Sequence, residues 1–439
     1  MEATRIQVLP DILIDQIAAG EVVETPASVV KELLENALDA GARRIVVEFA
    51  GGGLTHLRVI DDGEGMSAAD AVLALKRHAT SKIRGPSDLD RISTLGFRGE
   101  ALPSIASVSR FTLVTRRATD DVGTRVTAPD GRVSAEPTAA PPGTSVTVDD
   151  LFFNVPARLK FQKSQRTLAA GVSETMARVA LAFPDLHLVL APEGRRPTEY
   201  PPCRRLEDRV AQVFGREVGP RLYPVHEVRD GITVSGVVGD PALARGDTSR
   251  LVLLVNRRPV QDPALRRAVL NAYSVLVPAG RFPVAVLAVD LDPSDVDVNV
   301  HPRKTEVRFV RPREVAGVLF SAVQAAVTAT PWVAQAGLDP FATTGDTPDD
   351  MAGRPWAPDG SDAPLPDADW NRPPALQEPQ QGLFGEPAAG GMRMAELRYI
   401  GQVGRTVLVC EGRDTLVLVD QHAAHERVNF HRLWRGVQD

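Results

Sequence analysis

Cysteine is scarce in this chain of 439 residues, which contains only Cys203 and Cys410. Two cysteines this far apart provide neither a disulfide framework nor a metal site, a usage typical of the reducing cytoplasm. The sequence also lacks any uninterrupted apolar run close to the roughly 18 residues of a membrane span. Its first residues include Glu2, Arg5 and Asp11, which argues against a signal peptide. We therefore expect a cytoplasmic protein without membrane contacts.

The composition excludes a wholly disordered or collagen-like chain, because 43% of the residues are hydrophobic and 24% are charged. The length predicts about three domains. The net charge of the chain is −6. Residues 331–391 hold ten acidic and two basic residues, a net charge of −8, so the remainder of the chain carries +2. A nearly neutral remainder is compatible with weak DNA binding but does not indicate it.

Residues 331–391 also contain 11 of the 35 prolines, no isoleucine and a single valine. Such a segment cannot bury enough apolar surface to offset the entropy lost on ordering, so we predict a disordered acidic linker over 331–392. Before the linker, the pattern of helices and strands restarts after residue 205. The predicted domains are therefore 1–205, 206–330 and a short C-terminal part, 393–439, too small for a core of its own.

The first domain opens with strong helix signals. Thr25 is a good N-cap, Pro26 suits the first helical position, and Gly41 suits the stop after a helix over 26–40. Apolar side chains recur at helical spacing between them: Val29, Val30, Leu33, Leu34, Ala37 and Leu38. Two antiparallel strands and a further helix are predicted next, at 44–50, 54–60 and 67–79.

Residues 80–104 are rich in Gly, Ser, Thr and Pro and predict a long loop, and loops of this length inside a domain are usually functional. In the second domain, strands over 251–256 and 284–291 enclose a helix over 262–277, which predicts a parallel crossover. The mixture of elements indicates an α+β fold. Two further strands are predicted at 295–302 and 304–310.

The polar face of the helix over 26–40 carries Glu32 and Asn36, which are one turn apart and project together. A carboxylate beside an amide oxygen can hold a hydrated Mg²⁺ ion and orient a water molecule. Taken alone, however, this helix is more typical of a solvated polar surface.

Residues 61–66 follow a predicted strand and read Asp-Asp-Gly-Glu-Gly-Met. Glycines there let a ligand approach the backbone, and the Asp61 carboxylate can accept a hydrogen bond from an exocyclic amine such as that of adenine. A tight acidic turn is the alternative. The segment also matches the G-x-G-x-x-A dinucleotide fingerprint, which we reject because three acids crowd the position of the pyrophosphate.

The long loop contains candidate phosphate ligands before another predicted helix, because exposed backbone N–H groups at a helix N-terminus bind phosphate. The sequence has no G-x-x-x-x-G-K-[ST] motif, which excludes a Walker-type phosphate loop. An ordinary flexible loop is the alternative. The candidates are Thr80, Ser81, Lys82, Gly96, Phe97, Arg98 and Gly99.

Two later segments carry further candidates. The spacing Asp-x-Asp-x-Asn from Asp295 hints at a calcium loop, but Val300 stands where glycine is required, so we reject calcium. Lys304 can reach a neighbouring anion from a short connection, although a plain surface lysine is commoner. Near the C-terminus, three side chains share one face of a helix and can bind Zn²⁺ or Mn²⁺ or form polar surface: His422, His425 and Glu426.

Together and in this order, the motifs closely resemble the MutL family of DNA mismatch-repair proteins over about residues 5–330. The wider superfamily of gyrase-type topoisomerases, Hsp90 and histidine kinases shares only the Asn-bearing helix, the Asp-x-Gly-x-Gly turn and a glycine-containing lid. It lacks the Gln-Ile-Ala-Ala-Gly-Glu and Gly-Phe-Arg-Gly-Glu-Ala signatures. The matching segments are 16–23, 32–41, 61–66, 77–82, 96–102, 150–158 and 298–302.

The resemblance implies a two-layer α/β sandwich that binds ATP, of the Hsp90, gyrase and MutL type, and then a ribosomal-S5-like domain. It assigns Glu32 as the general base and Asn36 as the Mg²⁺ ligand. Asp61 would hold the adenine amino group, with Gly65 in the same turn and Thr144 in support. The lid around Gly96–Gly99 would wrap the phosphates, and Lys304 of the second domain, the other catalytic residue, would contact the γ-phosphate.

The resemblance also implies a function and partners. The protein would hydrolyse ATP to ADP and phosphate, and ATP would close the lid and join two N-terminal domains into a homodimeric clamp. Its partners would be single- or double-stranded DNA of any sequence, a mismatch-recognition protein of the MutS type, and a downstream nuclease or helicase, at the bacterial nucleoid. A matchmaker that binds ATP but scarcely hydrolyses it is the alternative.

Two departures from the family pattern bear on function. Arg257 stands where many relatives carry glycine. Together with Arg258, Arg266 and Arg267, it predicts a basic surface that faces DNA. The alternative is that these arginines are ordinary surface residues of a helix. His431 replaces the final glutamate of the family's nuclease motif, and the chain stops soon after. We therefore expect an incomplete C-terminal dimerisation domain without endonuclease activity, with metal-dependent nicking as the alternative.

Overall fold

The fold is described from a computed structural model. It describes residues 23–329, apart from 84, 86–93, 97–98, 130–131, 275, 279 and 298–306, and the backbone of three strands between residues 398 and 420. The chain divides into two compact units, Met1–Asp346 and Thr347–Asp439. Among the described residues, no helix combines the length and the apolar character needed to cross a membrane.

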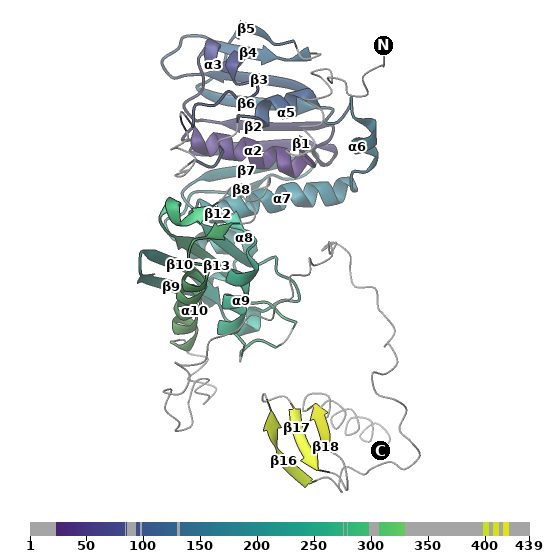
Figure 1. The fold of residues 1–439 in the computed structure, drawn as a ribbon. Helices are drawn as coiled ribbons and strands as arrows, with labels where there is room; N and C mark the ends of the chain where they lie inside the picture. The colour runs from purple at the N-terminus through teal and green to yellow at the C-terminus, as the bar shows by residue number, and fades with distance from the viewer. Residues whose placement is uncertain are drawn as a thin grey trace, which may run out of the picture. The chain divides into compact units, whose positions relative to one another are not determined.

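The first unit contains a sheet of eight strands in the order β5-β4-β3-β6-β2-β1-β7-β8 (Figure 1). Neighbouring strands are antiparallel except β1 and β7, which are parallel. The predicted hairpin is confirmed, with Val47 of β1 opposite Val59 of β2. The strands are β1 (Arg44–Ala50), β2 (His56–Asp61), β3 (Arg110–Arg116), β4 (Gly123–Thr127), β5 (Ser134–Thr138), β6 (Gly143–Asp149), β7 (His187–Pro192) and β8 (Thr198–Tyr200).

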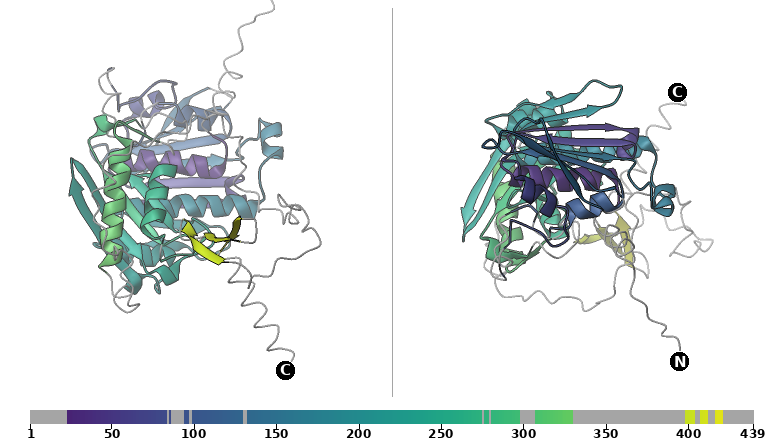
Figure 2. Two further views of the ribbon diagram at one scale, coloured as in Figure 1. Left: turned by 60° about the horizontal axis from the view of Figure 1, so that its bottom comes forward. Right: turned by 90° about the horizontal axis from the view of Figure 1, so that it is seen from above.

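Helices cover one face of this sheet (Figures 1 and 2). α2 lies between α5 and α7, and alternate residues of β1 are buried, namely Ile45, Val47 and Phe49. One-sided burial explains why these strands alternate apolar and polar residues. The helices of this part are α2 (Pro26–Asp39), α3 (Ala68–Leu73), α5 (Ala101–Ser107), α6 (Pro156–Lys160) and α7 (Gln165–Ala182).

The helix signals around α2 act as predicted. The Thr25 side chain accepts a hydrogen bond from Ser28 N at 3.3 Å, and Pro26 is the first helical residue. Gly41 follows the helix with φ +71°, a left-handed conformation that glycine adopts readily. The helix predicted over 67–79 is shorter, because α3 ends at Leu73 and the following residues form turns.

A second sheet, also in the first unit, has the strand order β12-β11-β13-β10-β9. β11 and β13 are parallel and α9 connects them, which confirms the predicted crossover. Of the two later predicted strands, only the short β14 and β15 lie in the described part. The elements are α8 (Leu206–Phe214), β9 (Leu222–Arg229), β10 (Ile232–Gly239), β11 (Leu251–Val255), β12 (Arg258–Val260), α9 (Pro263–Ala272), β13 (Ala285–Asp290), β14 (Val296–Asp297), β15 (Arg308–Phe309) and α10 (Pro312–Thr328).

Apolar packing joins the two sheets. α9 and α10 pack on one face of the second sheet, and the other face meets the end of α7 together with α8. This shared cluster includes Leu181 of α7, Val210 of α8 and Val286 of β13. The fully buried Arg209 adds hydrogen bonds to the carbonyls of Pro184 and Leu186, at 2.7 and 2.6 Å. The second sheet is therefore anchored to the helical layer of the first.

The second unit contains a three-stranded antiparallel sheet, β16 (Arg398–Val403), β17 (Val407–Glu411) and β18 (Leu416–Asp420). The predicted linker and the three candidate metal ligands His422, His425 and Glu426 lie outside the described residues. Their predicted roles remain predictions.

Candidate functional site

The polar side of α2 carries three carboxylates, Glu32, Glu35 and Asp39. The side chain of Glu32 is 17% exposed and that of Asp39 only 7%. Lys31 Nζ lies 2.9 Å from Glu35 Oε1 and 3.6 Å from Glu32 Oε1. Burial lowers the pKa of Lys31, but the charges of Glu35 and Glu32 outweigh it and the pKa is raised. The three acids therefore make this side of the helix attractive to cations.

Asp61 and Asp62 close the end of β2 in different ways. Asp62 Oδ1 accepts hydrogen bonds from the backbone N–H groups of Arg43 and Arg44, at 2.7 and 2.8 Å, so Asp62 ties the turn to β1. Asp61 Oδ1 accepts from Gly63 N at 2.9 Å. Burial raises the pKa of Asp61 to about 6, although backbone N–H groups, including that of Gly63, oppose the rise. Asp61 is thus a half-buried acceptor at a strand end.

Gly65 is required by a neighbouring strand. Its φ is +68°, and a Cβ atom built there would lie 2.2 Å from the carbonyl oxygen of Arg116 on β3. The sequence suggested that the glycines of this turn serve the approach of a ligand. At position 65, glycine is needed because the backbone of β3 passes too close for a side chain.

We expect Gly65→Ala to destabilise the protein by about 2–4 kcal/mol, through left-handed strain plus overpacking against β3. The matched control is Gly41→Ala, because Gly41 also has positive φ but its Cβ would meet nothing within 4 Å. That variant should lose only about 1 kcal/mol. Urea unfolding of both variants measures the difference, and equal losses would contradict the close-approach explanation.

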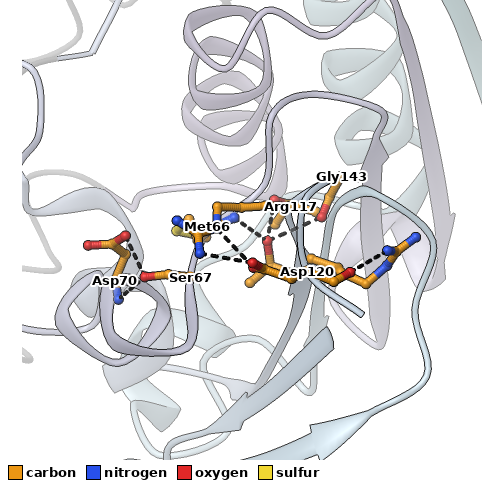
Figure 3. A network of polar contacts seen from close by, with 9 residues as sticks. Met66, Ser67, Asp70, Arg117, Asp120 and Gly143 are labelled. Atoms are coloured by element: carbon orange, nitrogen blue, oxygen red, sulfur yellow. Dashed lines mark hydrogen bonds and ion pairs between the residues drawn. The ribbon is translucent and has the colours of Figure 1, made fainter. Parts of the chain in front are cut away.

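Thr144 is held by Thr115, a residue that lies in none of the sequence motifs described above. Thr115 is fully buried on β3, and its Oγ1 lies 3.0 Å from Thr144 Oγ1. The same hydroxyl donates to Gly143 O at 3.1 Å and accepts from Met66 N at 2.9 Å (Figure 3). Thr115 therefore connects the end of the acidic turn to the start of β6. No local signal marks it, because its partners lie 28 to 49 residues away.

Asp39 connects α2 to both described ends of the loop over 80–104, which we call the lid. Lys82 Nζ lies 2.5 Å from Asp39 Oδ2 and donates to Asn36 Oδ1 at 2.9 Å. The N–H groups of Leu95 and Gly96 donate to Asp39 Oδ1 and Oδ2, at 2.8 and 2.9 Å. Asp39 lies just beyond Asn36 on the predicted polar face, but no sequence motif assigns it a role.

The ends of the lid also meet near Gly99. This glycine has φ +64°, and a Cβ atom there would lie 2.5 Å from the carbonyl oxygen of Ala79. Thr80 Oγ1 accepts a hydrogen bond from Lys82 N at 3.2 Å. This bond closes a tight turn around Ser81. Of the described phosphate candidates, Lys82 and Gly96 therefore contact α2, and Gly99 lies against Ala79. Three other predicted residues lie outside the described part: Phe97, Arg98 and Lys304.

The four arginines predicted to face DNA differ in exposure. Arg266 and Arg267 are exposed on α9, and Arg257 is exposed before β12, with its guanidinium 5.8 Å from the ring centre of Phe183. Arg258 is only 7% exposed, and its Nη2 donates to the carbonyl oxygen of Thr94 in the lid. Alternation along β12 turns Arg258 inward, so this side chain is not part of a DNA-facing surface.

Comparison with known proteins identifies the family. Residues 24–134 match the histidine kinase-, DNA gyrase B- and HSP90-like ATPases, 210–328 the C-terminal domain of DNA mismatch repair proteins, and 400–439 the MutL C-terminal dimerisation domain. A DNA mismatch repair protein MutL of Anaeromyxobacter dehalogenans is 47% identical over 457 residues, covering 98% of this chain and 75% of that protein. The chain belongs to the MutL family.

Two further comparisons extend this result. MutL of Symbiobacterium thermophilum is 42% identical, covering 99% of this chain and 76% of its own length. The solved N-terminal domain of a DNA repair protein has a TM-score of 0.61 at 24% identity, over 71% of this chain and 97% of that one, which concerns the fold alone. In this MutL-family chain, α2, the Asp61 turn and the described lid residues fall within the ATPase match, whereas Arg258 falls within the mismatch-repair match.

Proposed function

We propose that this MutL-family DNA mismatch repair protein binds ATP with Mg²⁺ at α2 and hydrolyses it. The observation that carries the proposal is the double role of this helix. Its polar side presents Glu32 and Asn36, and its last residue, Asp39, accepts hydrogen bonds from both described ends of the lid. Catalytic groups and a loop that can cover a nucleotide are thereby held by one rigid element.

The side chains of α2 suit the chemistry. Glu32 would accept a proton from the attacking water, as a general base. Asn36 would hold the Mg²⁺ ion through Oδ1, and this oxygen already accepts from the Lys82 ammonium, so its position suits a cation. When bound, the ion would neutralise charge on the phosphates. Lys82 and the lid N–H groups would share the remaining charge, with Lys304 proposed as the contact to the γ-phosphate.

The adenine would bind at the turn after β2. Asp61 ends that strand opposite Thr144 of β6. Its carboxylate would accept a hydrogen bond from the adenine amino group. Thr144, held by Thr115, would support the same edge of the base. This assignment predicts a dependence on pH, because the ionised carboxylate is the better acceptor.

Nucleotide affinity should fall as the pH drops through about 6, where the pKa of Asp61 lies. Since ordinary aspartate titrates at 3.8, the ionised group destabilises the fold above about pH 6, and this cost disappears as the pH falls toward 3.8. Asp61→Asn should therefore weaken nucleotide binding but stabilise the fold at pH 7.5, by at most about 3 kcal/mol.

Binding of a non-hydrolysable ATP analogue to parent and Asp61→Asn between pH 5 and 8, with thermal unfolding, provides the test. Phosphate itself titrates near pH 6, so only the difference between the two proteins reports Asp61. Parallel pH profiles, or a variant that binds as tightly as the parent, would contradict the assignment.

We further propose that ATP joins two copies through their N-terminal domains into a clamp on DNA of any sequence. The match to a dimerisation domain at 400–439 supports a dimer. A mismatch-recognition protein of the MutS type and a downstream nuclease or helicase are the proposed partners, and the bacterial cytoplasm at the nucleoid is the proposed place of action. The basic residues Arg257, Arg266 and Arg267 are proposed contacts to DNA phosphates.

Steady-state phosphate release by the full chain tests the proposed ATPase. We expect turnover with Mg²⁺ and none with excess chelator. Tight binding of the analogue without phosphate release would contradict hydrolysis and leave a matchmaker that only binds ATP. Supercoiled plasmid with Mn²⁺ should stay intact, and nicking that is lost in His422→Ala would instead support the proposed metal site at His422, His425 and Glu426.

A further inference from the structure

Arg258 extends from the second sheet into the ATPase domain. It begins β12, the edge strand of that sheet, which packs against α7 (Figure 1). Asn256 and Arg257 both have positive φ, 47° and 64°, and form a tight turn that places Arg258 opposite Val255 of β11. The guanidinium therefore rests on a rigid hairpin, and the side chain is buried.

Arg258 and α2 hold opposite ends of the same short segment of the lid, residues 94–96. Its Nη2 donates to the carbonyl oxygen of Thr94. The next two N–H groups, of Leu95 and Gly96, donate to the carboxylate of Asp39. Thr94 Oγ1 also donates to Gly96 O at 2.8 Å, which stiffens the segment. Residues 94–96 are thus fixed between α2 of the first domain and β12 of the second.

Charge favours the same arrangement. Burial lowers the pKa of Arg258, and the carboxylates of Glu35, Asp39 and Glu32 oppose this effect. A guanidinium remains protonated in proteins, and burying such a charge without opposite charges nearby is costly. The acidic side of α2 therefore stabilises β12 in the position from which Arg258 contacts the lid.

We propose that Arg258 is a positioning residue that couples the second domain to the lid by holding the Thr94 carbonyl. It fixes residues 94–96 against α2, the helix that carries Glu32 and Asn36, and it touches no nucleotide atom itself. The inference rests on the proposed function, because ATP turnover is one of its readouts. Loss of Arg258 should therefore change turnover and lid order far more than nucleotide affinity.

The test compares Arg258→Met, which removes the charge and the donors, with Arg258→Lys, which keeps the charge. Arg229→Met is the control, because Arg229 lies on β9 of the same sheet with a side chain that is 49% exposed. In the full chain, we would measure three quantities: the Kd of a non-hydrolysable ATP analogue, kcat and KM for phosphate release, and proteolytic cleavage within residues 80–104 with the analogue bound.

We expect Arg258→Met to lower kcat roughly tenfold or more and to lose the protection of the lid, while Kd changes by less than about threefold. Arg258→Lys should be intermediate, because an ammonium does not reproduce the planar guanidinium. Arg229→Met should match the parent. Unchanged kcat and lid protection in both Arg258 variants would overturn the proposal. A loss of affinity as large as the loss of kcat would also overturn it.

The test remains decisive if a variant does not fold or if the parent protein does not hydrolyse ATP. If Arg258→Met does not fold, Arg258→Lys decides alone: reduced kcat with unchanged Kd supports the coupling, and unchanged kcat overturns it. If the parent binds the analogue but releases no phosphate, the proposed hydrolysis fails, and lid protection still decides whether Arg258 positions the lid.

Discussion

Glu32→Ala should lower steady-state ATP turnover by about 10²-fold or more while ATP binding stays close to that of the parent. A general base acts on the water in the transition state, so its loss affects kcat more than the affinity for bound nucleotide. The fold should tolerate the change, because Lys31 keeps its ion pair with Glu35 at 2.9 Å. Phosphate release and equilibrium binding of a non-hydrolysable analogue, measured on one preparation, provide the test.

Two variants control this experiment. Glu32→Gln keeps the shape of the side chain but cannot accept the proton at neutral pH, so it should be nearly as slow as Glu32→Ala. Glu174→Ala on α7 removes a glutamate whose side chain is 59% exposed, and it should turn over ATP at the parental rate. If phosphate release is unchanged in both Glu32 variants, another group must activate the water.

Asn36→Ala should abolish the part of nucleotide binding that depends on Mg²⁺. The amide Oδ1 is the proposed protein ligand to the ion, and an alanine methyl group cannot replace it. Lys82 loses one acceptor but keeps the Asp39 carboxylate at 2.5 Å, so the lid contact to α2 should survive. Binding of an ATP analogue with Mg²⁺ and with chelator separates the two contributions.

In the Asn36→Ala variant, the two binding curves should coincide at the weak, metal-independent level. Asn271→Ala is the matched control, because Asn271 is an exposed asparagine on α9, in the second domain. Its binding should keep the parental response to Mg²⁺. An Asn36→Ala variant that binds the analogue with Mg²⁺ as tightly as the parent would show that the metal ligand is misassigned.

Sequence alone was sufficient for features that depend on a few neighbouring residues. The N-cap at Thr25, the proline after it and the apolar spacing predicted α2, and helical periodicity placed Glu32 and Asn36 on one side of it. Alternation and a glycine turn predicted the β1–β2 hairpin. The length of the segment between β11 and β13 predicted a parallel crossover. These features depend on local hydrogen bonds and on repeat patterns along the chain, and the tertiary structure retains them.

Tertiary structure alone decided which distant groups meet. Arg258 looked like a DNA-facing arginine in the sequence, yet it contacts Thr94, which is 164 positions away. Thr115 and Asp39 gained their roles in the same way, from the packing of β3 against β6 and of the lid against α2. A buried polar group must find a partner, but the free-energy cost of leaving it unpaired does not indicate which partner it finds. That choice is made when apolar faces pack, because packing brings segments far apart in the sequence within hydrogen-bond distance.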